Sequence, residues 1–179
     1  MSEPTPESNH NFKKTTTARE GRENQVYSEK GARVVAGTVI VDSANKKVLL
    51  VSSTSHRDKF ILPKGGVEKD EINDYAATAL RETWEEAGVT GTLGIKLGPP
   101  ILKLITHPKI LAELPEPKAF PYTEFHFYEL EFGKLEPVWP EGDKRDRVWA
   151  DPEEAVRLLT KSDRPEMVEA LERSSLFKA

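Results

Sequence analysis

The sequence predicts an α/β domain, because apolar runs typical of strands alternate with segments that have the spacing and end signals of helices. Residues 34–41 are rich in valine and isoleucine and are continuously apolar, which is typical of a strand buried on both faces. Residues 74–87 begin with an aspartate and are followed by a glycine, the residue types that begin and end helices. Two further helices are expected to begin near Pro152 and Pro165, since proline favours the first helical turn.

The other strands follow from shorter apolar runs between turn signals. Residues 47–53 form a hairpin with the first strand across the turn 42–46, and residues 60–62 form a short strand that Pro63 ends. We expect four more strands, near residues 92–97, 101–106, 123–132 and 147–150. Residues 107–121 contain four prolines and are predicted to be an irregular insertion.

The chain has 179 residues, the size of one domain with a tail. Residues 1–12 are expected to be a disordered tail, and residues 13–30 either an arm lying on the domain or a loop. Residues 31–179 are expected to be the folded domain, without internal repeats.

Composition excludes several classes of function. The chain has no cysteine, so disulfides, thiolate metal sites and cysteine nucleophiles are excluded. No apolar run is long enough to span a bilayer, and the polar first twelve residues do not resemble a secretory signal, so no membrane partner is expected. The net charge of −4 disfavours a stable nucleic-acid partner. We expect a monomer in the cytoplasm, the nucleus or both.

The predicted helix 74–87 has two chemically different faces. Small and apolar side chains form the face expected to be buried: Ala76, Ala79, Leu80, Thr83 and Ala87. Three carboxylates cluster on the opposite side at i, i+3 and i+4 spacing: Glu82, Glu85 and Glu86. A solvated acidic face is one explanation, but these charges lie near the helix C-terminus, where the helix dipole disfavours anions. A divalent cation explains them better, and magnesium prefers such oxygen ligands and bridges to phosphates.

The turn before this helix supports a phosphate site. Gly65 and Gly66 follow Lys64 at the end of a strand, and glycine lets the backbone approach a metal or phosphate closely. Arg81 precedes the carboxylates and is expected to hold one of them by a bidentate pair. The turn and the helix together indicate magnesium-dependent hydrolysis of a phosphoanhydride.

These residues resemble the signature of the Nudix hydrolases, G-x5-E-x7-R-E-U-x-E-E-x-G-U, in which U is a bulky apolar residue. Gly65 and Glu71 match its first half, and the second half is matched by Arg81, Glu82, Glu85, Glu86, Gly88 and Val89. The chain departs from the pattern twice. Nine residues instead of seven separate Glu71 from Arg81, and Thr83 stands at the first apolar position. The longer spacer leaves the supporting role of Glu71 open.

The resemblance implies a Nudix fold, an α/β/α sandwich with a mixed β-sheet. It also implies that Glu82 and Glu86 bind magnesium, with manganese as an alternative, and that the backbone at Lys64 and Gly65 completes the metal shell. Glu85 would be the general base, and Arg81 is assigned to the catalytic set with it. The stretches TAREGRENQVYS, LPKGGVEKDE, RETWEEAGV, TEFHFYELE and RPEMVEALERS are similar to the fungal branch of diphosphoinositol polyphosphate phosphohydrolases. That branch acts on inositol pyrophosphates, diadenosine polyphosphates and inorganic polyphosphate.

An inositol pyrophosphate is a dense polyanion, so its site is expected to contain many cations. The candidate substrate contacts are basic or hydroxylated residues near the ends of predicted elements: Arg22, Arg33, Ser53, Thr54, Ser55, Arg57, Lys59, Arg145, Arg147 and Arg164. The resemblance assigns phosphate contacts to Arg33, residues 53–55, Arg145 and Arg164, although arginine is more common in the family where Ser55 stands. Taken singly, each of these cations is also typical of a solvated surface.

Two other functions remain open. A nucleotide pyrophosphatase, such as a dinucleoside polyphosphate or cap hydrolase, needs an aromatic clamp for its base, and no exposed aromatic pair is evident. A catalytically silent polyphosphate-binding module is disfavoured by the intact set of Arg81 and three glutamates. His126 is interpreted equally as a pocket residue or a structural histidine, whereas Trp84 and Trp149 are expected in the core.

Overall fold

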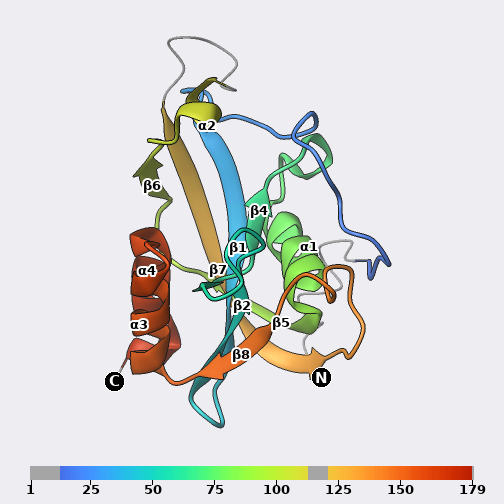
Figure 1. The fold of residues 1–179 in the computed structure, drawn as a ribbon, viewed down its shortest axis with the longest axis vertical. Coiled ribbons are helices and arrows are strands. Elements are labelled where there is room, and N and C mark those ends of the chain that lie inside the picture. Colours follow the sequence, from blue (N-terminus) through green and yellow to red (C-terminus); the bar gives the residue numbers. More distant parts are fainter. Residues whose placement is uncertain (1–12, 113–120, 179) are drawn as a thin grey trace.

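The computed structural model describes residues 13–112 and 121–178, which form a mixed sheet between helices (Figure 1). The strands are β1 (Arg33–Asp42), β2 (Lys47–Ser52), β3 (Phe60–Ile61), β4 (Lys64–Gly66), β5 (Val89–Lys96), β6 (Ile101–Leu104), β7 (Tyr122–Leu135) and β8 (Arg147–Ala150). The sheet order is β3-β2-β1-β7-β5, with β4 paired to β1, β6 to β7 and β8 to β2. The sheet is mixed because β1 and β7 run parallel while the other pairs are antiparallel.

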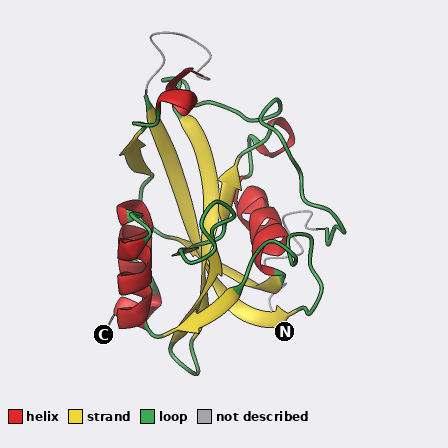
Figure 2. Ribbon diagram, viewed as in Figure 1, coloured by secondary structure: helices red, strands yellow, loops and turns green. Residues whose placement is uncertain are grey.

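Helices cover both faces of this sheet (Figure 2). Helix α1 (Tyr75–Ala87) lies on one face, and α3 (Pro152–Lys161) and α4 (Pro165–Glu172) lie on the other. A short helix, α2 (Pro108–Ala112), follows β6, and single 3-10 turns occupy Lys69–Glu71 and Ser175–Phe177. The α/β/α sandwich is therefore confirmed.

The core forms on both sides of β1, whose inner residues are all buried. Val39, Leu50 and Leu130 belong to a large cluster that also contains Leu159 and Met167 from α3 and α4. On the other side of the strand, Val34, Ala36 and Val67 pack with Ala79 of α1. The prediction of a strand buried on both faces is confirmed, because each face meets a helical layer.

Local signals define α1 as predicted. The Asp74 carboxylate accepts a hydrogen bond from the Ala77 N–H at 3.2 Å, which caps the first turn. Gly88 adopts the left-handed conformation with φ 65°, and its N–H donates to the Trp84 carbonyl at 3.0 Å. Thr83 is buried in the apolar stripe, where its hydroxyl donates to the Ala79 carbonyl at 2.7 Å. A hydroxyl is tolerated at this usually apolar position because its hydrogen-bonding capacity is satisfied.

Some boundaries differ from the prediction. Strand β5 begins at Val89, directly after the glycine that ends α1, and not near residue 92. The insertion 107–121 was predicted to be irregular, but Pro108–Ala112 is helical, since proline at a first helical position is compatible with a helix. Residues 113–120 and the expected tail 1–12 lie outside the described part of the chain. Among the described helices, none is long and apolar enough to cross a membrane.

The segment 13–30 lies on the domain as an arm. The Val26 N–H donates to the Val67 carbonyl at 2.9 Å, and Gln25 forms a bridge with Glu68. Nearer its start, the Thr15 carbonyl accepts a hydrogen bond from the Trp84 indole at 2.9 Å. These contacts place the arm against β4 and α1, beside the three glutamates.

Candidate active site

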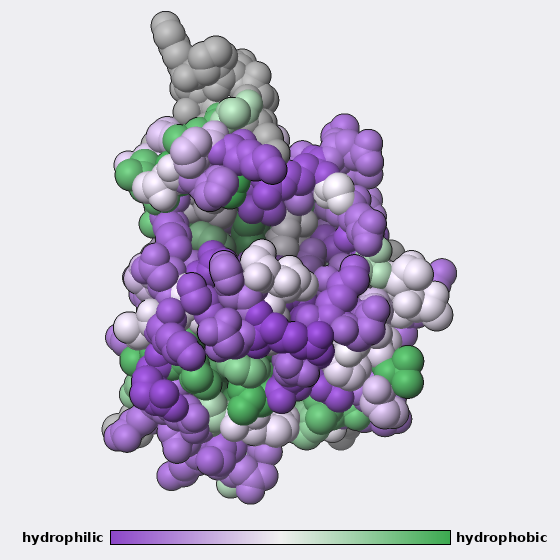
Figure 3. Space-filling view, viewed as in Figure 1, coloured by the Kyte–Doolittle hydropathy of each residue, from purple (hydrophilic) through white to green (hydrophobic). Residues whose placement is uncertain are grey.

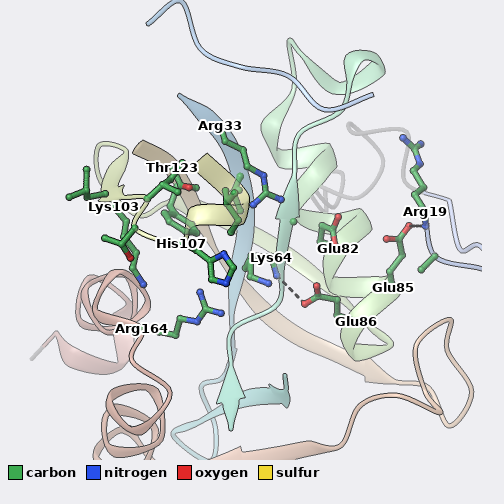
Figure 4. A pocket seen from close by; sticks show the side chains of 18 of the residues that line it. Arg19, Arg33, Lys64, Glu82, Glu85, Glu86, Lys103, His107, Thr123 and Arg164 are labelled. Atoms are coloured by element: carbon green, nitrogen blue, oxygen red, sulfur yellow. Dashed lines mark hydrogen bonds between the residues drawn. The ribbon is translucent and has the colours of Figure 1, made fainter. Parts of the chain in front are cut away.

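A cavity of about 420 Å³ lies at the end of the sheet near α2, a size typical of small-molecule sites. Its lining comes from the arm, α1, α2, β1, β4, β6, β7, the segment between β6 and α2, the loop before β8 and the residue before α4. Figure 3 shows that the surrounding face is mostly hydrophilic and is hollowed below α2. Figure 4 shows two walls, with Glu82, Glu85 and Glu86 on one side and Lys103, His107 and Arg164 on the other.

The three glutamates of α1 do not form a solvated acidic face. Glu85 is 2% exposed and Glu86 5% exposed, and all three line the cavity. That explanation from the sequence is therefore wrong. The carboxylates are enclosed because β4 and the loop before β8 cover the helix on this side: the Lys64 N–H donates to Glu86 and Arg145 pairs with it.

Enclosure shifts the ionisation of these groups. Burial, with added repulsion from Glu86, raises the pKa of Glu82 to about 7. Burial and the nearby charge of Glu82 likewise raise the pKa of Glu85 to about 7. Burial also raises the pKa of Glu86, against the opposing charges of Lys64 and Arg145. Three buried carboxylates whose charged forms are disfavoured by burial favour a bound cation.

The Arg81 guanidinium donates hydrogen bonds to two glutamates of the cluster and to Glu71. Its Nε and Nη2 bind the two oxygens of Glu71 at 2.8 and 2.9 Å, while its Nη1 donates to Glu82 at 2.8 Å and to Glu85 at 3.2 Å. The bidentate partner is thus Glu71, whose supporting position survives the longer spacer. The spacer includes the loop before α1, where Ile72 is 53% exposed.

Gly65 brings the backbone close to the carboxylates. Gly65 lies in β4 and pairs with Ala36 of β1. A Cβ at position 65 would collide with the Glu82 carboxylate. Within the described residues no three acidic, histidine or cysteine side chains form a metal cage. Magnesium usually takes one or two protein carboxylates and keeps water or substrate phosphate as its other ligands. Glu82 and Glu86 beside a glycine backbone therefore fit this ion.

The arm contributes a contact that the motif did not predict. The Arg19 N–H donates to Glu85 Oε1 at 3.1 Å, while its guanidinium binds Asp70 at 3.0 and 3.1 Å and Glu68 at 2.8 Å. Together with Arg81, this contact gives both Glu85 oxygens a donor. Arg19 also lines the cavity, so residues far apart in sequence meet at Glu85.

The predicted substrate contacts divide into two groups. Arg33 and Arg164 line the cavity, as do Lys64 and Gly65, which were predicted to complete the metal shell. The others are not among the described residues of its wall: Arg22, Ser53, Thr54, Ser55, Arg57, Lys59, Arg145 and Arg147.

Several of these cations have protein partners instead. Arg57 forms an exposed pair with Asp146 at 2.9 Å. Arg145 is buried and binds Glu86 at 3.2 Å and the Ser52 carbonyl at 2.8 Å, so it supports the cluster from behind. Arg147 donates to the carbonyls of Ala87 and Glu136 at 2.9 Å and stacks on Trp139 at 3.7 Å. Arg147, predicted as a substrate contact, does not line the cavity, because β8 directs it against the end of α1.

The cavity also contains residues that the sequence prediction missed: Lys103, His107, Thr123 and Glu141. Lys103 had a detectable signal, since it is the one charged residue in the apolar run of β6. His126, by contrast, is buried outside this cavity, with its Nε2 at 2.7 Å from Glu124 and its ring against Tyr75. Trp84 is buried as expected.

Comparison with known proteins identifies the family, since residues 31–171 match the model of the NUDIX domain. The chain belongs to the Nudix family. It is similar to Nudix hydrolase 21, chloroplastic, of Arabidopsis thaliana, with 35% identity over 86% of this chain and 73% of that protein. It is also 31% identical to human diphosphoinositol polyphosphate phosphohydrolase 3-alpha, over 86% of this chain and 85% of that protein.

Solved structures agree on the fold of this Nudix hydrolase. The E. coli dihydroneopterin triphosphate pyrophosphohydrolase superposes with a TM-score of 0.62 at 18% identity, covering 87% of this chain and all of that one. A C. elegans Ap4A hydrolase complex gives 0.56 at 22% identity, covering 82% and 97%. Nudix enzymes generally use a divalent metal such as Mg²⁺, which agrees with the carboxylate pair described above.

Proposed function

We propose that this Nudix hydrolase removes the β-phosphate from diphosphoinositol polyphosphates, with secondary activity on diadenosine polyphosphates and inorganic polyphosphate. The observation that carries the proposal is the pairing of a buried carboxylate cluster with a cationic opposite wall in one cavity. The first wall fits the hydrolysis of a phosphoanhydride, and the second fits a substrate with several additional phosphates.

Glu85 is proposed as the general base. Its carboxylate is oriented by the Arg81 guanidinium at 3.2 Å and the Arg19 N–H at 3.1 Å, so the side chain is held in one position in the cavity. It accepts a proton from the attacking water, and the charge of Arg81 favours the deprotonated form that can act as a base. A base held in this way typically contributes about 10²–10⁴-fold to a rate.

Glu82 and Glu86 are proposed as the carboxylates that hold magnesium, next to the backbone of Lys64 and Gly65. When bound, the ion neutralises phosphate charge and lowers the pKa of a coordinated water. Arg81 and Arg145 then have a positioning role, since each contacts one of these carboxylates, at 2.8 and 3.2 Å. They keep the two side chains beside Gly65 of β4.

The lining of the cavity and the named relative support the proposed substrate class. Arg33, Lys64 and Arg164 offer cations to phosphates, and the human relative that is 31% identical is named for action on diphosphoinositol polyphosphates. Phe125 is the one phenyl, indole or phenol ring among the described lining residues. The imidazole of His107 is the other aromatic ring among them, so the preference for an inositol phosphate over a nucleotide rests on the cations of the lining.

The test is phosphate release with magnesium from an inositol pyrophosphate, a diadenosine polyphosphate and long-chain polyphosphate in separate reactions. We expect the inositol pyrophosphate to give the highest kcat/KM. Glu85→Gln is expected to lower kcat by about 10²-fold or more with little change in the magnesium requirement. Glu86→Gln is expected to raise the magnesium concentration needed for half-maximal rate. Full activity of both variants on all three substrates would refute the mechanism, and a preference for the nucleotide would refute the substrate.

A further inference from the structure

A buried carboxylate that neither the motif nor the proposed reaction uses contacts two cations on the wall of the cavity that faces the glutamates, without lining the cavity itself. Glu166 lies in the first turn of α4 and its side chain is 1% exposed. Its two oxygens accept no hydrogen bond within the described part of the chain. A buried charge without hydrogen bonds is strongly unfavourable unless cations compensate it.

Two cations provide that compensation. Lys103 of β6 places its Nζ 3.1 Å from Glu166 Oε2, and Arg164 places its Nη1 3.8 Å from Oε1. The Lys103 ammonium also donates to the Asp163 carbonyl at 3.3 Å. Asp163 has a φ of 56°, a left-handed conformation that is uncommon outside glycine and often marks functional sites. Glu166 thus fixes a lysine and an arginine from different elements side by side.

Both cations remain available to a ligand. The side chains of Lys103 and Arg164 are 33% and 35% exposed, and both line the cavity. One carboxylate between two cations leaves a net positive charge on this wall. In Figure 4 these side chains lie across the cavity from Glu82 and Glu86, with Lys64 and Arg33 between the two walls.

We propose that Lys103, held beside Arg164 by Glu166, forms a distal anion subsite that selects substrates with phosphates beyond the scissile anhydride. The inference rests on the proposed function, because the scissile group must lie at the glutamates for this wall to be distal. Ring phosphates of an inositol and the further phosphates of a linear polyphosphate share the chemistry that this subsite recognises. Lys103 acts as a specificity-determining residue and Glu166 as a positioning residue.

The simplest contrary explanation is that Lys103 serves only to neutralise Glu166. A double variant separates the two roles. Lys103→Met leaves Glu166 with one distant partner and is expected to destabilise the fold. Lys103→Met combined with Glu166→Gln removes both charges, so it restores stability without restoring a cation to the cavity. Lys103→Arg keeps the positive charge at position 103. Lys161→Met is a control for the single variant Lys103→Met, because it removes one positive charge at an exposed position in the last turn of α3.

The assay is titration calorimetry with inorganic tripolyphosphate and with orthophosphate, in magnesium buffer at fixed ionic strength. All proteins also carry Glu85→Gln so that tripolyphosphate is not consumed. We expect the double variant to bind tripolyphosphate about tenfold or more weakly, with orthophosphate affinity unchanged. Lys103→Arg and Lys161→Met should bind both as the parent does. The proposal is overturned if the stable double variant binds tripolyphosphate like the parent, or if orthophosphate affinity falls equally.

This outcome is distinguishable from failure of the proposed function. If the wild type hydrolyses no inositol pyrophosphate but tripolyphosphate binding depends on Lys103, the subsite stands and the substrate proposal fails. If hydrolysis is observed and the double variant binds normally, only the subsite fails.

Discussion

The unusual ionisation of Glu82 predicts that the metal-free protein loses stability as the pH rises towards neutrality. Its pKa is raised from 4.5 to about 7, chiefly by burial and then by the charge of Glu86. A raised carboxyl pKa means that the folded state retains its proton longer than the unfolded state. The contribution to stability is therefore complete below about pH 4.5 and is lost between about pH 4.5 and 7. At about 1.4 kcal/mol per pKa unit, the loss is at most roughly 3 kcal/mol.

The matched perturbation is Glu82→Gln, which keeps the shape of the side chain and removes the charge. His126 acts in the opposite direction, because burial lowers its pKa from 6.5 and stability from this group rises with pH. Both proteins retain His126, so its effect cancels in the comparison. Asp70 has a lowered pKa from its pair with Arg19 and acts only at more acidic pH, since its reference value is 3.8.

The assay is thermal unfolding in EDTA from pH 5 to 7.5, followed by the same series with excess magnesium. The variant should gain on the wild type as the pH rises, by up to roughly 6–12 °C in Tm for a protein of this size. Magnesium should then raise the Tm of the wild type more than that of the variant, and more at pH 7.5 than at pH 5. If the Tm values of the two proteins in EDTA change with pH in parallel, the argument that ionised Glu82 destabilises the folded state is refuted.

Three further predictions concern other parts of the site. Gly65→Ala is expected to lower activity by about 10²-fold with a small change in Tm, because the added methyl displaces the Glu82 carboxylate. Measurements of magnesium affinity and of the hydrolysis rate test this expectation, and a variant that binds magnesium normally would contradict it. Arg19→Ala keeps the backbone N–H that donates to Glu85 but removes the guanidinium bonds to Glu68 and Asp70 that hold the arm in place. Because Glu85 is then less firmly oriented, we expect kcat to fall more than KM rises, and a pure KM effect in steady-state kinetics would argue against this. Arg147→Met is expected to lower the free energy of unfolding in urea by about 2 kcal/mol without changing KM, because Arg147 donates to two backbone carbonyls and does not line the cavity. An unchanged urea midpoint would count against this prediction.

Helix α1 shows why much of the site was predictable from sequence. Its start at Asp74, its end at Gly88 and the grouping of Glu82, Glu85 and Glu86 are set by residues within one helix. Such features follow from local geometry, in which side chains three and four positions apart are neighbours. The same is true of the β1–β2 hairpin, whose strands are close in sequence.

The positions of the arginines show the limit of that approach. Arg145 and Arg147 are two residues apart, yet one supports Glu86 and the other stacks on Trp139. Sequence assigned both to the substrate, because a charge carries no information about which long-range partner it meets. Arg19 and Lys103 illustrate the reverse case, since they reach the cavity only when the arm and β6 are placed against the domain.

The sequence by itself determined the α/β class, the carboxylate helix, the glycine pair beside it and their hydrolytic chemistry, because each depends on short-range spacing. The expected glycine turn is instead strand β4, which pairs with β1. Only the tertiary structure decided that the glutamates are buried, that Glu71 is the bidentate partner of Arg81, and that Glu166 holds two cations on the opposite wall. Burial and charge pairing of this kind depend on contacts between distant segments, which spacing along one chain does not specify.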